Sequence, residues 1–236
     1  MDTKLTGKTR IESDLIGARE IPAEALYGVQ TLRGIENFSI SKFRLSEYPL
    51  FIKGLAITKM AAAMANFELG LLTVEQKDAI IAACGEIIDG KHHDQFPVDM
   101  IQGGAGTTTN MNANEVIANR ALELMGHERG EYQYCSPNDH VNCSQSTNDA
   151  YPTAIHIGMY FKHLQLLPHL EELIASFRKK GEEFSQIIKM GRTQLEDAVP
   201  MTLGQTFNGF ASILQDEIAH LNEAAADFLV VNMGAT

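Results

Sequence analysis

Apolar residues recur every three or four positions over two stretches in the first half of the chain. The first stretch lies between Pro49 and Gly70, and its repeating positions are Ile52, Leu55, Ala56, Met60, Ala63, Met64 and Phe67. This spacing is typical of a helix with one buried face, since proline suits a helix start and glycine favours a helix end. A second helix is predicted from Thr73, which forms a capping-box pattern with Gln76, to Gly90.

Three more helices are predicted farther along the chain. One covers about residues 111–125 and ends at Gly126. The next begins near Ala150 and continues through Pro168, where a kink is expected because proline removes one backbone hydrogen bond. The last covers residues 203–228, where apolar positions step by about 3.6 residues on average, as in a long bundle helix. Residues 1–48 are expected to form mainly turns and short extended pieces, with a short helical or irregular segment over residues 27–33.

These elements predict a mainly α fold with two parts. Residues 1–141 are expected to form an N-terminal, mostly helical domain, and residues 142–236 the first part of a central helical-bundle domain that is incomplete at the C-terminus. Two long helices cannot cover each other's apolar faces completely. We therefore expect further residues, other chains or both to complete the bundle.

The overall composition excludes several classes of protein. The chain has 236 residues and a formal net charge of −11, which argues against binding to nucleic acid. No apolar run reaches the length of a membrane span, and the first four residues lack the apolar core of a secretory signal. Cys84, Cys135 and Cys143 show neither a disulfide framework nor metal-ligand spacing. We expect a soluble cytoplasmic protein that binds no membrane.

Three polar segments each stand just before or at the start of a predicted helix. They read GGAGTTTN over residues 103–110, NCSQSTND over residues 142–149 and GRTQ over residues 191–194. If these helix starts converge, hydroxyls, amides and backbone N–H groups surround a site suited to a small anion. The alternative for each segment is a helix cap or a turn. Asn112 and Asn119 are poor helix formers and are expected either to serve such a site or to tie a helix to a loop as buried amides.

Taken together in this order, the three segments resemble the fumarase/aspartase superfamily. The similar stretches are GAGT and NMNANE within residues 104–115, PNDHVN and SQSTND within residues 137–149, and GRTQL with DA and a proline within residues 191–200. The resemblance extends from about Arg10 to the last residue and is closest to the aspartase (aspartate ammonia-lyase) branch. It implies a mostly helical homotetramer in which three chains build each active site.

The resemblance also implies a reaction and the residues that carry it. The reaction is the reversible elimination of ammonia from L-aspartate to give fumarate, through a dianionic intermediate that the site must stabilise. The implied substrate-binding residues are Thr107, Ser146 and Thr147, which hold a carboxylate, and Asn148, Thr193 and Gln194, which complete the contacts. Short hydroxyls and amides near helix N-termini suit this task because they donate several hydrogen bonds to oxyanions.

Two positions separate the branches of the superfamily. Fumarases carry histidine after the Gly-Arg-Thr sequence and tend to carry histidine before Pro-Asn-Asp, whereas this chain has Gln194 and Ser136. A glutamine cannot exchange a proton near neutral pH, which favours the ammonia-lyase branch. A fumarate hydratase and a non-catalytic structural protein with the same fold are the alternatives, and a purely structural role of Gln194 stays open.

Part of the active site implied by the resemblance lies outside this sequence. The catalytic serine of the superfamily, with a lysine and an asparagine that bind substrate, stands on a flexible loop expected beyond Thr236. No catalytic residue is therefore assigned in this chain, which is expected to be inactive alone. No cofactor is expected to be required, because no cluster has the spacing of a catalytic metal site and the adjacent His92 and His93 predict a solvated loop. Activation by Mg²⁺ stays open.

Overall fold

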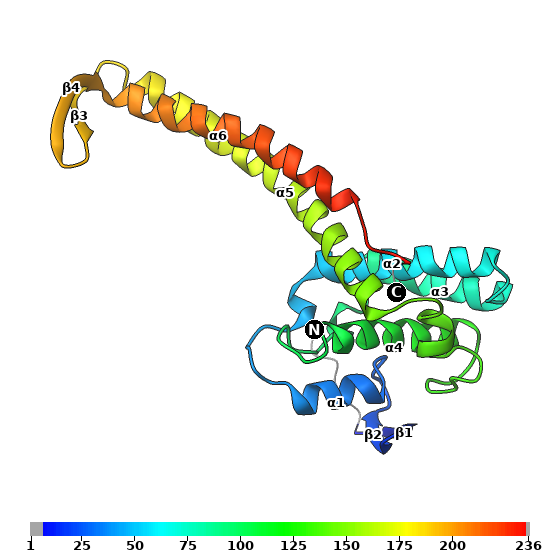
Figure 1. Ribbon diagram of the computed structural model, residues 1–236. Coiled ribbons are helices and arrows are strands. Elements are labelled where there is room, and N and C mark those ends of the chain that lie inside the picture. Colours follow the sequence, from blue (N-terminus) through cyan, green and yellow to red (C-terminus); the bar gives the residue numbers. More distant parts are fainter. Residues whose placement is uncertain (1–6, 235–236) are drawn as a thin grey trace. The chain divides into compact units, whose positions relative to one another are not determined.

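The computed structural model describes residues 7–234, which are mainly helical (Figure 1). They form two compact units: unit 1 extends to Met159 and includes the segment from Val231, and unit 2 is Tyr160–Val230. The domain division after residue 141 stays a prediction, and the expectation about a secretory signal concerns residues that lie outside the described part.

Unit 1 opens with an antiparallel hairpin of two strands, β1 (Thr9–Asp14) and β2 (Gly17–Pro22). The helices that follow are α1 (Val29–Asn37), α2 (Pro49–Glu68), α3 (Val74–Ile88) and α4 (Thr107–Leu124). Short helical turns lie at Leu45–Glu47, His93–Gln95 and Pro137–Val141. The first turns of the long helix α5 (Thr147–Glu183) also belong to unit 1.

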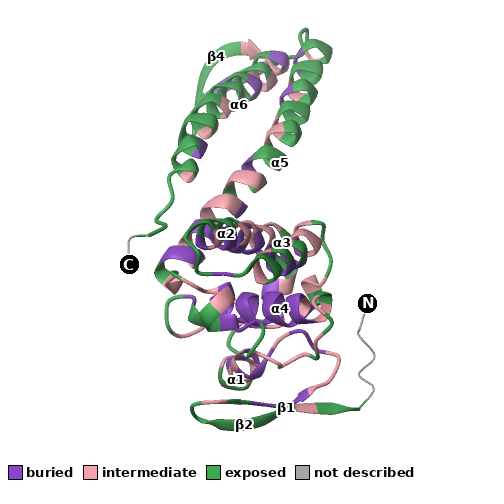
Figure 2. Cartoon of the chain, turned by 90° about the vertical axis from the view of Figure 1, so that its right-hand side faces the viewer, coloured by how far each residue is buried: buried purple, intermediate pink, exposed green. Residues whose placement is uncertain are grey.

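The hydrophobic core of unit 1 lies among α2, α3 and α4, where Figure 2 shows most of the buried residues. Its largest fully buried apolar side chains include Ile52, Leu55, Ile80, Phe96, Ile117 and Leu122. By length and composition alone α2 would be long and apolar enough to cross a membrane, but 56% of that window is buried inside the protein. Its packing on α3 and the fully buried Lys59 identify α2 as a core helix.

Two carboxylates from distant parts of the chain hold the N-terminus of α1. Glu115 of α4 accepts three backbone N–H groups at 2.8–3.0 Å, those of Gly28, Gln30 and Thr31. Glu12 of β1 accepts the N–H of Val29 at 3.1 Å. The first N–H groups of a helix have no partner within the helix, and its dipole favours negative charge there. Glu115 and Glu12 therefore replace the side-chain cap that Gly28 cannot provide.

The predicted helices of unit 1 are present, with earlier starts than expected. Thr73 and Gln76 form the predicted capping box of α3. However, α4 begins at Thr107 and not near residue 111, and α5 begins at Thr147 and not at residue 150. The polar segments thus supply the first helical turn themselves, because a glycine with φ of 96° (Gly106) ends the loop before α4.

The amides and histidines with open assignments have structural partners. Asn112 donates to the carbonyl of Gln95 at 3.0 Å, and Asn119 donates to the carbonyl of Leu26 at 2.8 Å. Both are therefore buried amides that tie α4 to loops. His92 lies in a turn and His93 begins a short helical turn, but both are half-buried and not fully solvated. The His92 ring nitrogen lies 2.9 Å from a carboxylate oxygen of Glu86.

Unit 2 contains the rest of α5, the hairpin of β3 (Ile188–Thr193) and β4 (Glu196–Thr202), α6 (Leu203–Ala226) and a turn at Asp227–Leu229. The expectation that residues 191–194 stand at a helix start is wrong. Thr193 ends β3, Gln194 lies in the turn with φ of 54°, and α6 begins only at Leu203. A two-stranded hairpin has only edge strands, which is why β4 tolerates Pro200.

Within unit 2 the two long helices leave much apolar surface open. Phe177 of α5 packs on Phe207 and Phe210 of α6, with ring centroids 6.0 and 5.6 Å apart. Other large apolar side chains of these helices are more than two-fifths exposed, among them Leu164, Leu166, Leu173 and Ile213. This agrees with the expectation that α5 and α6 alone cannot cover their apolar faces.

Candidate functional site

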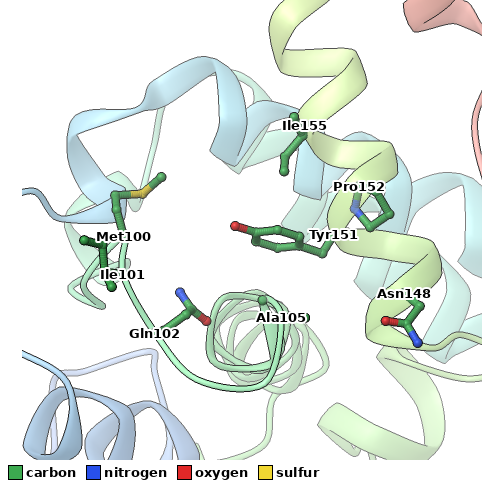
Figure 3. A pocket seen from close by; sticks show the side chains of 9 residues that line it. Met100, Ile101, Gln102, Ala105, Asn148, Tyr151, Pro152 and Ile155 are labelled. Atoms are coloured by element: carbon green, nitrogen blue, oxygen red, sulfur yellow. The ribbon is translucent and has the colours of Figure 1, made fainter.

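Two of the three polar segments meet at one pocket of unit 1. The pocket has a volume of about 570 Å³ and is lined by Met100, Ile101, Gln102, Ala105, Gly106, Asn148, Tyr151, Pro152 and Ile155. Figure 3 shows the side chains from the loop before α4 and from the first turns of α5 around a common space, with the Tyr151 ring between the two groups. The convergence of two of the expected helix starts is thus present in the fold.

The glycine-rich loop shapes one wall of this pocket. Gly104, Ala105 and Gly106 have φ values of 73°, 49° and 96°, a left-handed run that glycine adopts without strain. A Cβ atom on Gly106 would stand 2.4 Å from ring atoms of Tyr151, so only glycine fits there. The exposed Thr107 follows as the first residue of α4, and its hydroxyl donates to the carbonyl of Gly104 at 2.6 Å.

The start of α5 presents the second polar segment. Ser146 Oγ accepts the backbone N–H of Asn148 at 3.1 Å, and the backbone N–H of Ser146 donates to the Asp149 carboxylate at 2.8 Å. These reciprocal bonds cap the helix, as short polar residues do at helix starts. Asn148 is exposed at the pocket, and Thr147 is half-buried beside it.

A buried amide joins the two helix starts. Asn110 of α4 is 1% exposed, and its Nδ2 lies 3.3 Å from Thr147 Oγ1 and 3.1 Å from Asn142 Oδ1. Asn142 also donates its own Nδ2 to the carbonyl of Gln145 at 2.9 Å. The segment before α5 is therefore bonded both to itself and to α4.

Lys59 of α2 anchors the same segment from the core. Its side chain is fully buried, and Nζ donates to Asn142 Oδ1 at 2.8 Å and to Gln145 Oε1 at 3.1 Å. Burial lowers the pKa of Lys59 from 10.5 to about 7 because a charged amine loses its hydration inside the protein. Sequence patterns did not predict that this lysine is buried, since a lysine on a helix usually extends to solvent.

Of the sequence-predicted site residues only Asn148 lines this pocket, while Thr107, Ser146 and Thr147 are close neighbours in sequence of the lining residues Gly106 and Asn148. Thr193 and Gln194 belong to the hairpin of unit 2, where both are exposed. Ser136, the position that separates the branches, donates from Oγ to the Asp139 carboxylate at 3.0 Å in unit 1. Gln102 and Tyr151 line the pocket although sequence reasoning missed them, because neither stands in a motif.

The pocket offers hydrogen-bond donors near two helix N-termini, a setting that binds carboxylates. In the part of the chain from residue 7 to residue 234, no group of three or more His, Cys, Asp or Glu side chains is placed to hold a metal ion. The chemistry that these residues can perform is therefore the binding and orientation of an anion through hydroxyls, amides and backbone N–H groups.

Comparisons with known proteins found one family and several similar proteins. A family described as lyase matches residues 17–236. An aspartate ammonia-lyase of Pseudomonas canavaninivorans is 58% identical over 228 residues, which are 96% of this chain and 48% of that protein. A native crystal structure of fumarate lyase:delta crystallin from Brucella melitensis has a TM-score of 0.93 and 54% identity, covering 97% of this chain and 53% of that chain.

A class II fumarase from Schistosoma mansoni is more distant in sequence. It has a TM-score of 0.89 and 37% identity, and the match covers 97% of this chain and 48% of that chain. This chain spans about half the length of the curated relatives it matches, and it aligns with their N-terminal portion. The chain is thus similar in sequence to proteins named aspartate ammonia-lyase and in fold to a protein named fumarase.

Proposed function

The chain belongs to the lyase family of the fumarase/aspartase superfamily, and on this premise we propose that it forms part of an aspartate ammonia-lyase. The reaction is the elimination of ammonia from L-aspartate. A base takes a proton from the carbon beside the side-chain carboxylate, the carbon–nitrogen bond breaks, and fumarate and ammonia leave. The intermediate carries two negative charges on that carboxylate, which hydrogen-bond donors must stabilise.

In this proposal unit 1 binds one end of the substrate. Ser146 and Thr147 donate to a carboxylate, and Asn148 adds an amide at the mouth of the pocket. Thr107 joins them by turning its hydroxyl from the carbonyl of Gly104 to the substrate. Thr193 and Gln194 complete the contacts from the hairpin of unit 2, in an active site shared between chains. The serine base belongs to a segment outside residues 1–236, so that this chain alone has no turnover.

One observation carries the proposal: the loop before α4 and the start of α5 line the same pocket, and Asn110 bonds directly to Thr147. These segments stand far apart in the sequence, and each alone would pass as a helix cap. Their meeting at a pocket with donors on both walls supports a carboxylate-binding site. The relatives named aspartate ammonia-lyase support aspartate as the substrate.

The exposed apolar side chains of unit 2 support assembly into a homotetramer. Isolated surface Leu or Ile residues are ordinary, but a helix pair with a long open apolar face is typical of an interface. We place the assembled enzyme in the cytoplasm, because Cys84 and Cys135 are buried free thiols.

A parallel assay separates this function from the alternatives. The absorbance of fumarate would be followed with L-aspartate and with malate, for the full-length gene product and for residues 1–236. We expect turnover of aspartate by the full-length protein and none by the shorter chain. Greater turnover of malate than of aspartate would identify a fumarate hydratase, the alternative favoured by the likeness to the Schistosoma mansoni fumarase. No turnover of either would favour a structural protein.

A further inference from the structure

The Thr147 hydroxyl accepts a hydrogen bond from the protein but donates none to it within the described residues. Asn110 Nδ2 donates to Thr147 Oγ1 at 3.3 Å, so the oxygen acts as the acceptor of this bond. Within residues 7–234 no protein acceptor takes the hydroxyl proton in return. A threonine hydroxyl has one proton to donate, and here that proton is available to a bound oxyanion.

We propose that Asn110 is a positioning residue, which orients the Thr147 hydroxyl so that its proton is donated to the substrate carboxylate. This inference rests on the proposed function, in which Thr147 contacts that carboxylate. It adds a residue that does not touch the substrate and acts through Thr147. Asn110 suits the role because it is 1% exposed and lies within the first turn of α4, next to the start of α5.

The direction of the Asn110 bond is fixed by its neighbours. Asn142 directs its Nδ2 to the carbonyl of Gln145, which leaves Oδ1 to face both Lys59 Nζ and Asn110 Nδ2, at 2.8 and 3.1 Å. If the amide of Asn110 were reversed, its oxygen would face the oxygen of Asn142. Lys59, which can only donate, thus sets the orientation of the Asn142 amide, and Asn142 sets that of the Asn110 amide. Asn110 therefore points its Nδ2 at Thr147, whose hydroxyl oxygen accepts this bond.

Asn112 provides a matched control on the same helix. It is fully buried, and its Nδ2 donates to the carbonyl of Gln95, away from Thr147. In both asparagines the side-chain oxygen is buried without a partner in the described structure. Truncation of either residue removes an amide of the same size from α4, so the two variants share the cost of lost packing and differ in their contact with Thr147.

The test compares four variants of the full-length protein: Asn110→Ala, Asn110→Asp, Thr147→Ala and Asn112→Ala. We expect kcat/KM for L-aspartate to fall about tenfold in the first three, as for the loss of one hydrogen bond to a charged group. Asn110→Asp is isosteric but offers only acceptors, so the Thr147 proton would turn inward. Asn112→Ala should lower the thermal midpoint and leave kcat/KM unchanged.

A double variant distinguishes positioning from general structural damage. If Asn110 acts through Thr147, Asn110→Ala combined with Thr147→Ala should lower kcat/KM no more than Thr147→Ala alone. The inference would be overturned if the two substitutions lowered kcat/KM by factors that multiply in the double variant, or if Asn112→Ala lowered kcat/KM equally. In either case, turnover of aspartate by the unaltered protein would still uphold the proposed function.

A crystal structure of the Asn110→Ala variant, in which Thr147 Oγ1 loses its partner, gives an answer that does not depend on turnover. We expect the Thr147 side chain to rotate or residues 142–149 to shift relative to the unaltered protein. An unchanged Thr147 hydroxyl would refute the positioning role even if the unaltered protein proved inactive on aspartate.

Discussion

Lys59 Nζ lies 2.8 Å from Asn142 Oδ1, inside the core of unit 1, and no ion pair joins this lysine to a carboxylate in the described part of the chain. A buried amine with amide partners is more easily deprotonated than one paired with a carboxylate. This contact therefore links the pH of the solution to the segment that carries Ser146 and Thr147.

We predict that stability rises with pH through the titration of Lys59. The folded-state pKa is about 7 and the usual value is 10.5, so between these values the unfolded chain binds more protons than the folded chain. Raising the pH in this window favours the folded state, by at most about 1.4 kcal/mol per pH unit.

Urea unfolding of the unaltered protein and of Lys59→Met at pH 7, 8 and 9 measures this effect. The difference in unfolding free energy should shift in favour of the unaltered protein as the pH rises. The range ends at pH 9 because the Cys84 thiol of the unfolded chain, with its ordinary pKa of 9.0, titrates there as well. In the folded chain burial raises the pKa of Cys84 to about 12. Parallel pH profiles would contradict the assignment.

Glu115→Gln should weaken the start of α1. The substitution replaces one of two oxygens that accept backbone N–H groups with an amide nitrogen, which repels those donors. We expect a loss of about 2–4 kcal/mol in the free energy of unfolding, as for buried donors left without an acceptor. Glu75→Gln, in the exposed first turn of α3, is the control and should change stability by less than about 0.5 kcal/mol. Equal losses would argue against the capping role.

Gly54→Ala and Gly85→Ala should have opposite effects although both glycines lie in helices. A Cβ on Gly54 would stand 2.3 Å from the carbonyl oxygen of Ala154, whereas a Cβ on Gly85 meets nothing within 4 Å. We expect a loss of about 1–3 kcal/mol from overpacking at Gly54. At Gly85 we expect a gain of about 0.5–1 kcal/mol from helix propensity. Thermal unfolding measures both, and a tolerated alanine at position 54 would mean that α2 and α5 pack less closely.

Gln194→His in the full-length protein should raise activity on malate, because an imidazole can exchange protons near neutral pH and an amide cannot. The fumarate absorbance assay with malate measures the gain. Gln215→His, on the exposed surface of α6, introduces the same residue outside the proposed site and should change nothing. A malate rate that does not respond to Gln194→His would remove this position as the branch determinant.

Dialysis against EDTA should leave most of the aspartate turnover of the full-length protein, since the proposed site binds its substrate through hydroxyls and amides. Added Mg²⁺ is then expected to act at most as an activator. Calcium, which prefers more oxygen ligands, serves as the comparison ion. Complete loss with EDTA, restored by Mg²⁺, would show that a metal ion is essential.

Sequence periodicity predicted the helices well because each of α2, α3 and α6 carries regularly spaced apolar residues, which α2 and α3 bury in the core of unit 1. It failed at the hairpin of β3 and β4, where Gly191 and Pro200 resemble a break between helices and the strands have no apolar alternation. The helix starts at Thr107 and Thr147 were placed too late, since threonine and asparagine have low helix propensity.

For the candidate site, motifs identified the segments but not the contacts between them. The pairing of Asn110 with Thr147 depends on how α4 and α5 pack, which no local pattern encodes. Lys59 was missed for a similar reason, because only the tertiary structure surrounds it with amide oxygens. The resemblance to the superfamily supplied the remaining assignments.

The capping of α1 by Glu115 also has a consequence for the order of events on the ribosome. Gly28 and Thr31 precede their carboxylate partner by 87 and 84 residues. At about 5–20 residues per second, α1 leaves the exit tunnel roughly 4–17 s before Glu115 is available. The N–H groups of Gly28, Gln30 and Thr31 therefore have no carboxylate acceptor until α4 is made, and the start of α1 is completed only after that interval.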